Sequence, residues 1–102
     1  MTIVVNIKTE KYDVYIGRHQ DPIMGKWGNP FSCKEGTLAK YKTSTRKESI
    51  EKHLEYVRNT PELINSLHEL KDKKLGCFCV PKSCHGNNYV LLLNELKTQS
   101  LF

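Results

Sequence analysis

Apolar residues along this chain of 102 residues recur with two different spacings, which predict a mixture of strands and helices. Thr2 to Ile7 is rich in β-branched residues and is typical of a buried strand. Tyr12 to Ile16 alternates between apolar and polar positions and predicts a second strand. A short apolar run from Lys74 to Val80 predicts a third.

Helical spacing appears in two consecutive segments in the middle of the chain. Thr45 followed by Glu48 is a capping box, which predicts that a helix begins there. Thr60-Pro61 predicts the start of a second helix, because proline is favoured at the first helical position. The apolar residues expected to face inward are Ile50, Leu54 and Val57 in the first helix and Leu63, Ile64, Leu67 and Leu70 in the second.

The last helix is expected from Asn88 to Gln99, with Tyr89, Leu92, Leu93 and Leu96 on one side. Between Arg18 and Thr43 there is little periodicity, and the segment is expected to be an ordered loop. The resulting order is two strands, a loop, two helices, a strand and a helix. It predicts an α/β fold of one domain, residues 1–102, with a small sheet of about three or four strands covered by three helices.

The composition of the chain says more about where the protein is expected to be located than about its function. No apolar run approaches the ~20 residues of a membrane span, and no secretory signal is evident, so we expect a cytoplasmic protein with no membrane partner. The four cysteines are then expected to be reduced thiols or metal ligands. The net charge of +5 favours polyanionic partners, and Lys40, Lys42, Arg46 and Lys47 form a loose basic group that is either a nucleic-acid surface or simply solvated.

Side chains that can react or bind a metal are most concentrated between Cys77 and His85, where the third expected strand leads into the last expected helix. Cys77, Cys79, Cys84 and His85 form a formal set of three thiolates and one imidazole, as in some tetrahedral zinc sites. Their spacing differs from that of common zinc modules, and Cys33 is a further candidate ligand.

Two other interpretations of this segment stay open. Cys84 lies near a helix N-terminus, where the helix dipole favours a nucleophilic thiolate, and His85 is a candidate general acid or base. Alternatively the cysteines are structural and pack as small apolar side chains, which suits Cys77 best.

A second motif, Lys26-Trp-Gly-Asn-Pro-Phe31, follows the strand that ends at Gly17-Arg18. Trp27 offers a flat face on which a base or sugar stacks, Asn29 is placed to orient such a ligand, and Arg18 is placed to contact a phosphate. The alternative is an ordered loop whose aromatic side chains cap the sheet.

These segments resemble the uncharacterised family known as domain of unknown function 4326, which is found in bacteria and many phages. The resemblance is carried by Val14-Tyr-Ile-Gly-Arg18, by Lys26-Trp-Gly-Asn-Pro-Phe31, and by Leu75-Gly-Cys-Phe-Cys79 with Cys84-His-Gly86. It implies a small α/β domain whose motif residues gather at one site. Members typically carry an acidic residue directly after Cys-His-Gly, whereas this chain has Asn87, so a carboxylate available for base catalysis or cation binding is missing.

The sequence therefore favours an enzyme or sensor, with a phage-encoded protein acting in the host cytoplasm. Its ligand is expected to be a nucleotide or nucleic acid, with catalysis by Cys84 or His85 and ligand binding by Arg18, Trp27, Asn29, Cys79, Gly86 and Asn87. The alternative is a non-enzymatic protein, stabilised by zinc or inhibiting a host protein.

Overall fold

The computed structural model describes residues 2–21, 25–32, 41–78 and 84–98 of the chain, and the side chains of residues 96–98 are not described. Five strands lie in this part of the chain: β1 (Ile3–Asn6), β2 (Val14–Tyr15), β3 (Phe31–Ser32), β4 (Tyr41–Lys42) and β5 (Lys74–Cys77). The helices are α1 (Arg46–Arg58), α2 (Pro61–Ser66), the 3-10 helix η1 (Leu67–Leu70) and α3 (Gly86–Thr98). The predicted α/β fold, with three helices and a small sheet, is confirmed.

The main sheet has three strands in the order β1-β5-β2, and both pairings are parallel. Leu75 in the central strand pairs with Val4 on one side and Val14 on the other. Because side chains alternate along a strand, Leu75 and Cys77 point to one face of the sheet, and both are buried. The central position of β5 therefore places Cys77 in the middle strand of the main sheet.

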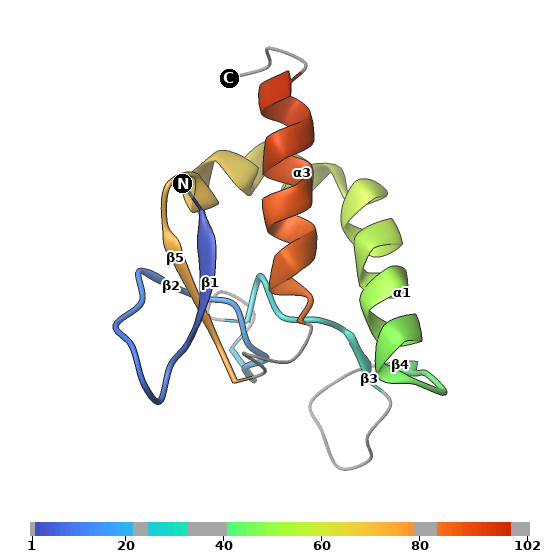
Figure 1. Cartoon of the computed structure of the whole chain (residues 1–102). Helices are drawn as coiled ribbons and strands as arrows, with labels where there is room; N and C mark the ends of the chain where they lie inside the picture. The colour runs from blue at the N-terminus through green and yellow to red at the C-terminus, as the bar shows by residue number, and fades with distance from the viewer. Residues whose placement is uncertain (1, 22–24, 33–40, 79–83, 99–102) are drawn as a thin grey trace.

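The helix α3 lies between this sheet and α1 (Figure 1). Gly86, the first residue of α3, allows this close packing: a Cβ at this position would lie 2.7 Å from Ile16 Cδ1 and 2.9 Å from Val4 Cγ2. The glycine therefore lets the first turn of α3 approach the sheet, and a larger side chain there would displace the helix.

The capping box that predicts the start of α1 is present. Glu48 N donates to Thr45 Oγ1 at 3.1 Å, and Ser44 N donates to Glu48 Oε1 at 3.0 Å. The return bond of the box is thus made by Ser44 rather than by Thr45 itself. Pro61 begins α2 as expected, and the helix tightens into η1 after Ser66.

Several elements differ from the sequence prediction, and β1 is one residue shorter at each end than the expected Thr2 to Ile7. The segment expected to be an irregular loop contains β3 and β4, which pair in parallel and place Phe31 opposite Tyr41. Strands of two residues have no measurable period, so the pattern of the sequence could not reveal them. The second strand is also limited to Val14–Tyr15, and α3 begins at Gly86, two residues before its expected start.

The third expected strand, β5, ends at Cys77 rather than at Val80, because the described residue Phe78 is already outside it. Val80, Gln99, Lys40 and Cys33 lie outside the described residues. The side chain of Leu96 is likewise not described. Within the described residues, no helix has both the length and the apolar character needed to cross a membrane.

Candidate functional site

His85 lies at the junction of the three sequence motifs, immediately before α3. Its Nε2 is 2.7 Å from Ile16 O and 3.1 Å from Trp27 O. Carbonyl oxygens only accept hydrogen bonds, so Nε2 carries the proton and donates to both. The imidazole thereby ties the end of β2 to the Trp27 loop, and its side chain is buried with 8% exposure.

His53 and Tyr89 continue this network between α1 and α3. Tyr89 Oη donates to Trp27 O at 2.6 Å, and His53 Nε2 lies 3.0 Å from Tyr89 Oη. Asn88 Nδ2 donates to His53 Nδ1 at 3.0 Å and to Ile50 O at 2.8 Å. Because Nδ1 accepts from an amide, a neutral His53 carries its proton on Nε2 and donates it to Tyr89.

Burial determines the charge state of this network. His53 is fully buried, and its pKa falls from 6.5 to about 2, chiefly because burial desolvates it and also because of its electrostatic interactions with His85 and Arg18. Burial also raises the pKa of Tyr89 well above its usual value. Both groups are therefore neutral at physiological pH.

The side chains of Arg18 and Asn29 form hydrogen bonds with the backbone around Phe31. Arg18 Nε donates to Asn29 O at 2.6 Å, and its Nη2 donates to Phe31 O at 2.8 Å. Asn29 Oδ1 accepts from Phe31 N at 2.9 Å, while its Nδ2 donates to Ser49 Oγ at 2.9 Å. Ser49 Oγ in turn donates to Phe31 O at 2.8 Å. The expected phosphate and ligand contacts of Arg18 and Asn29 are thus replaced by contacts that fix the position of Phe31.

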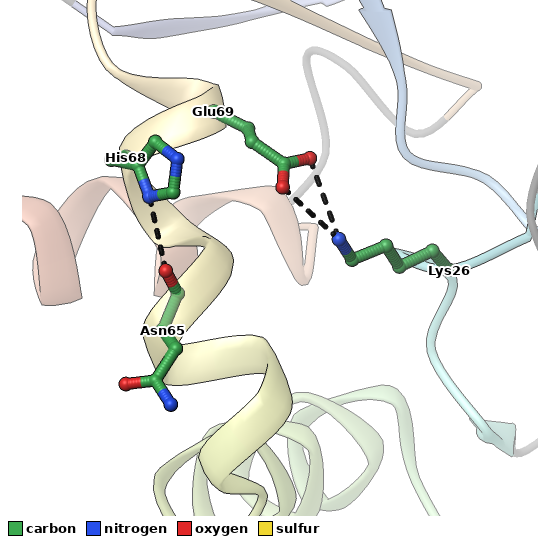
Figure 2. A network of polar contacts seen from close by, with 4 residues as sticks. All are labelled: Lys26, Asn65, His68 and Glu69. Atoms are coloured by element: carbon green, nitrogen blue, oxygen red, sulfur yellow. Dashed lines mark hydrogen bonds and ion pairs between the residues drawn. The ribbon is translucent and has the colours of Figure 1, made fainter.

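Trp27 is buried, with 4% exposure, which contradicts the stacking role expected for it. Its ring meets Tyr89 edge-on at a centroid distance of 5.2 Å, and Lys26 Nζ lies 5.0 Å from its ring centroid. Lys26 is held there by Glu69 of η1, with Nζ–Oε2 at 3.2 Å (Figure 2). A base cannot stack on a ring whose surroundings are filled in this way.

The start of α3 contains Gly86 and Asn87, which were expected to bind a ligand. Gly86 N donates to Cys84 Sγ at 3.4 Å, Asn87 N to Cys84 O at 3.0 Å, and Asn88 N to His85 O at 3.0 Å. These amides are already engaged, so they are not presented to an anion. Asn87 itself is exposed.

Cys77 and Cys84 lie side by side in the core, each with 2% exposure and with their sulfur atoms 3.1 Å apart. Cys84 Sγ is also 3.5 Å from His85 Nδ1. Cys79, the other thiol of the predicted zinc set, lies outside the described residues. Among the residues that the structure does describe, no group of three histidine, cysteine or carboxylate side chains is placed to hold a metal ion.

Every buried side-chain nitrogen and oxygen in the described residues has a hydrogen-bond partner. The motif residues Arg18, Trp27, Asn29, Cys84, His85 and Gly86 therefore do come together, but they bond to each other and to the backbone. Their arrangement is that of a buried polar network, which rigidifies a fold when all of its members are satisfied.

A cleft of about 470 Å³ lies between α1 and the β3–β4 pair. Three aromatic side chains line it: Phe31, Tyr41 and Tyr56. The rings of Phe31 and Tyr41 are tilted by 30° with centroids 5.2 Å apart, and Tyr56 meets Phe31 edge-on. Tyr41 is 56% exposed, so one aromatic surface of the cleft is open to solvent.

Charged side chains complete the lining of this cleft. Lys42 and Lys52 contribute positive charge, and Glu48 and Glu55 contribute negative charge. Glu48 is engaged in the cap of α1, whereas Lys52 and Glu55 make no ion pair within the described residues. The cleft therefore combines aromatic surfaces with the charged side chains of Lys52 and Glu55.

His53, Tyr89 and Ser49 were not recognised as site residues from the sequence. Ser49 and His53 are buried together with Val57, so the inward stripe of α1 runs through positions 49, 53 and 57. Two polar residues at helical spacing within a buried stripe are a signal of a polar network, and this signal is visible in the sequence. The cleft, by contrast, depends on the pairing of β3 with β4 and has no comparable signal.

Comparison with known proteins gives a family and one distant relative. The model of the family described as "Domain of unknown function (DUF4326)" matches residues 5–95. An uncharacterised protein of Acanthamoeba polyphaga mimivirus is 34% identical over 90 residues, which cover 76% of this chain and 62% of the relative. The chain thus spans less than two thirds of the length of that protein. No solved structure matches the chain.

Proposed function

The chain belongs to the DUF4326 family, and from this premise we propose that it binds a nucleotide-like or nucleic-acid ligand in the cleft between α1 and the β3–β4 pair. The supporting observation is the position of Phe31. Two family motifs, through the side chains of Arg18 and Asn29, hold its backbone by two hydrogen bonds, one to Phe31 O and one from Phe31 N, and its ring lines the cleft. Arg18 Nε also donates to Asn29 O, two residues before Phe31.

Tyr41 supplies the recognition surface for a base in this proposal. Its exposed ring lies against Phe31, which limits the orientations it can take. Stacking on such a ring tolerates any base, because every base has a π-face, and it contributes ~1–3 kcal/mol per base. This assigns to Tyr41 the role expected for Trp27.

The charged residues of the cleft fit the remaining parts of a nucleotide. Lys52 and Lys42 suit a phosphate, and the net charge of +5 favours the encounter with a polyanion. Glu55 suits the hydrogen-bond donors of a ribose or of an exocyclic amine, because a carboxylate only accepts hydrogen bonds. No cysteine or histidine is among the described residues that line the cleft, so the proposed activity of this site is binding rather than catalysis.

Calorimetric titration with the four ribonucleoside monophosphates and with an oligothymidylate of eight nucleotides tests the proposal. Tyr41→Ala should weaken binding by about tenfold to a hundredfold, because it removes the stacking surface. Lys52→Ala should weaken binding and reduce its dependence on salt.

Tyr12→Ala is the matched control, because Tyr12 is also an exposed tyrosine, at 45%, but is not among the residues lining this cleft. It should leave the affinity unchanged. The proposal is wrong if none of these probes binds, or if Tyr12→Ala weakens binding as much as Tyr41→Ala.

A further inference from the structure

Cys77 and Cys84 are the chemistry-bearing residues that the binding cleft does not use. Cys77 ends β5 and Cys84 precedes α3, and the two sulfur atoms face each other at 3.1 Å in the core. A disulfide bond is about 2.05 Å long, so closing this pair requires the sulfur atoms to approach by only about 1 Å. From this geometry we infer that Cys77 and Cys84 form an oxidisable dithiol, a modification site whose reactant is a hydroperoxide.

The surroundings of Cys84 favour its role as the first thiol to react. In neutral His85, Nε2 carries the proton because it donates to two carbonyl oxygens, so Nδ1 is the unprotonated nitrogen. Nδ1 lies 3.5 Å from Cys84 Sγ, in position to take the thiol proton. The Gly86 N–H, 3.4 Å from the same sulfur, stabilises the resulting thiolate.

The reaction with hydrogen peroxide then balances in two steps. The Cys84 thiolate attacks one peroxide oxygen, the O–O bond breaks, and hydroxide leaves and takes the proton to become water, which gives a sulfenic acid on Cys84. Cys77 then attacks Cys84 Sγ, the S–S bond forms, and the sulfenic oxygen leaves as a second water with the Cys77 proton. Two thiols are oxidised and one peroxide is reduced.

The burial of the two thiols is expected to slow this reaction without preventing it. Both thiols have 2% exposure, so the oxidant reaches them only during transient opening of the core around the two sulfur atoms. Once Cys84 is oxidised, the neighbouring Cys77 is already in place. We therefore expect the disulfide to form in preference to the higher oxides of sulfur.

The test uses the full chain and a Cys33→Ser/Cys79→Ser variant that retains only this pair. After treatment with hydrogen peroxide and alkylation under denaturing conditions, the variant should be lighter by two hydrogens and carry no alkyl group, and dithiothreitol should reverse the change. Digestion of the oxidised wild type should yield a peptide pair linked through Cys77 and Cys84. Two alkylated thiols in the variant, or a wild-type disulfide to Cys79 or Cys33 instead, would overturn the inference.

His85→Gln tests the part played by the imidazole. Glutamine retains an N–H close to the position of Nε2 but has no counterpart of Nδ1. Disulfide formation should slow by at least about tenfold in this variant, with the folded state checked by circular dichroism. An unchanged rate would show that His85 does not take the thiol proton.

Discussion

Phe31 connects two regions that use polar side chains in opposite ways. Its backbone is held by Asn29 and lies beside a second buried hydrogen-bond group that contains His85 and His53; in the described residues every buried side-chain nitrogen and oxygen has a hydrogen-bond partner. Its ring belongs to the cleft, where Tyr41 is exposed. The difference shows that the polar residues of the sequence motifs bond within the fold, while Tyr41, the exposed aromatic residue of the cleft, belongs to none of the three motifs.

The comparison predicts that substitutions in the network change stability, and that substitutions in the cleft change binding. The largest effect is expected for His85→Ala. This substitution removes the donor to Ile16 O and one of the two donors to Trp27 O, and it leaves a cavity in the core. We expect the free energy of unfolding in urea to fall by about 3 kcal/mol. A loss below about 1 kcal/mol would show that the imidazole does not hold these carbonyls together.

The next effect is the pH dependence that arises from His53. Its pKa is about 2 in the folded protein and near 6.5 when the chain is unfolded, so below pH 6.5 the unfolded chain binds a proton that the folded protein does not. The stability contributed by neutral His53 is complete above pH 6.5 and is lost as the pH falls. At a pH about two units below 6.5, the loss should reach about 2–3 kcal/mol.

Carboxylates also titrate over this range, so the measurement compares the wild type with His53→Gln. The difference in unfolding free energy between the two proteins should narrow as the pH falls, because only the wild type loses the contribution of His53. If the difference in unfolding free energy between the two proteins stays constant over the roughly three pH units from pH 7.5 to pH 4.5, the surroundings of His53 tolerate its charge and the account of its pKa is wrong.

The smallest effect on stability is expected for Tyr41→Ala. The side chain is 56% exposed and lies at the edge of the two-stranded pair, so the free energy of unfolding should change by no more than about 0.5 kcal/mol. The same substitution is expected to remove most of the ligand affinity. If thermal or urea unfolding shows a loss as large as that of His85→Ala, the contrast between the two regions does not hold.

Much of the fold was predictable because long elements have a period. The capping box at Thr45, the proline at the start of α2 and the apolar run of β5 each identified an element within a few residues of its observed position. The β3–β4 pair was not predictable, because two strands of two residues each are defined by their partners rather than by their own sequence.

The candidate site was predictable only in part. The motif residues do meet, because Arg18 and Asn29 both bond to the backbone of Phe31, and His85 bonds to Trp27 O. The motifs did not indicate which way the side chains point. Whether the side chain of Arg18 or of His85 faces solvent or a buried carbonyl depends on how α1 and α3 pack. Nearly all residues of these two helices lie outside the sequence motifs.

The most direct test of the account is a titration of ¹⁵N-labelled protein with adenosine monophosphate, followed by amide and indole chemical shifts. The account predicts that the largest shifts occur at Tyr41, Lys42, Lys52 and Tyr56. Shifts concentrated instead on the Trp27 indole and on residues 85–88 would place the ligand at the buried network, and would contradict the division between a structural core and a binding cleft.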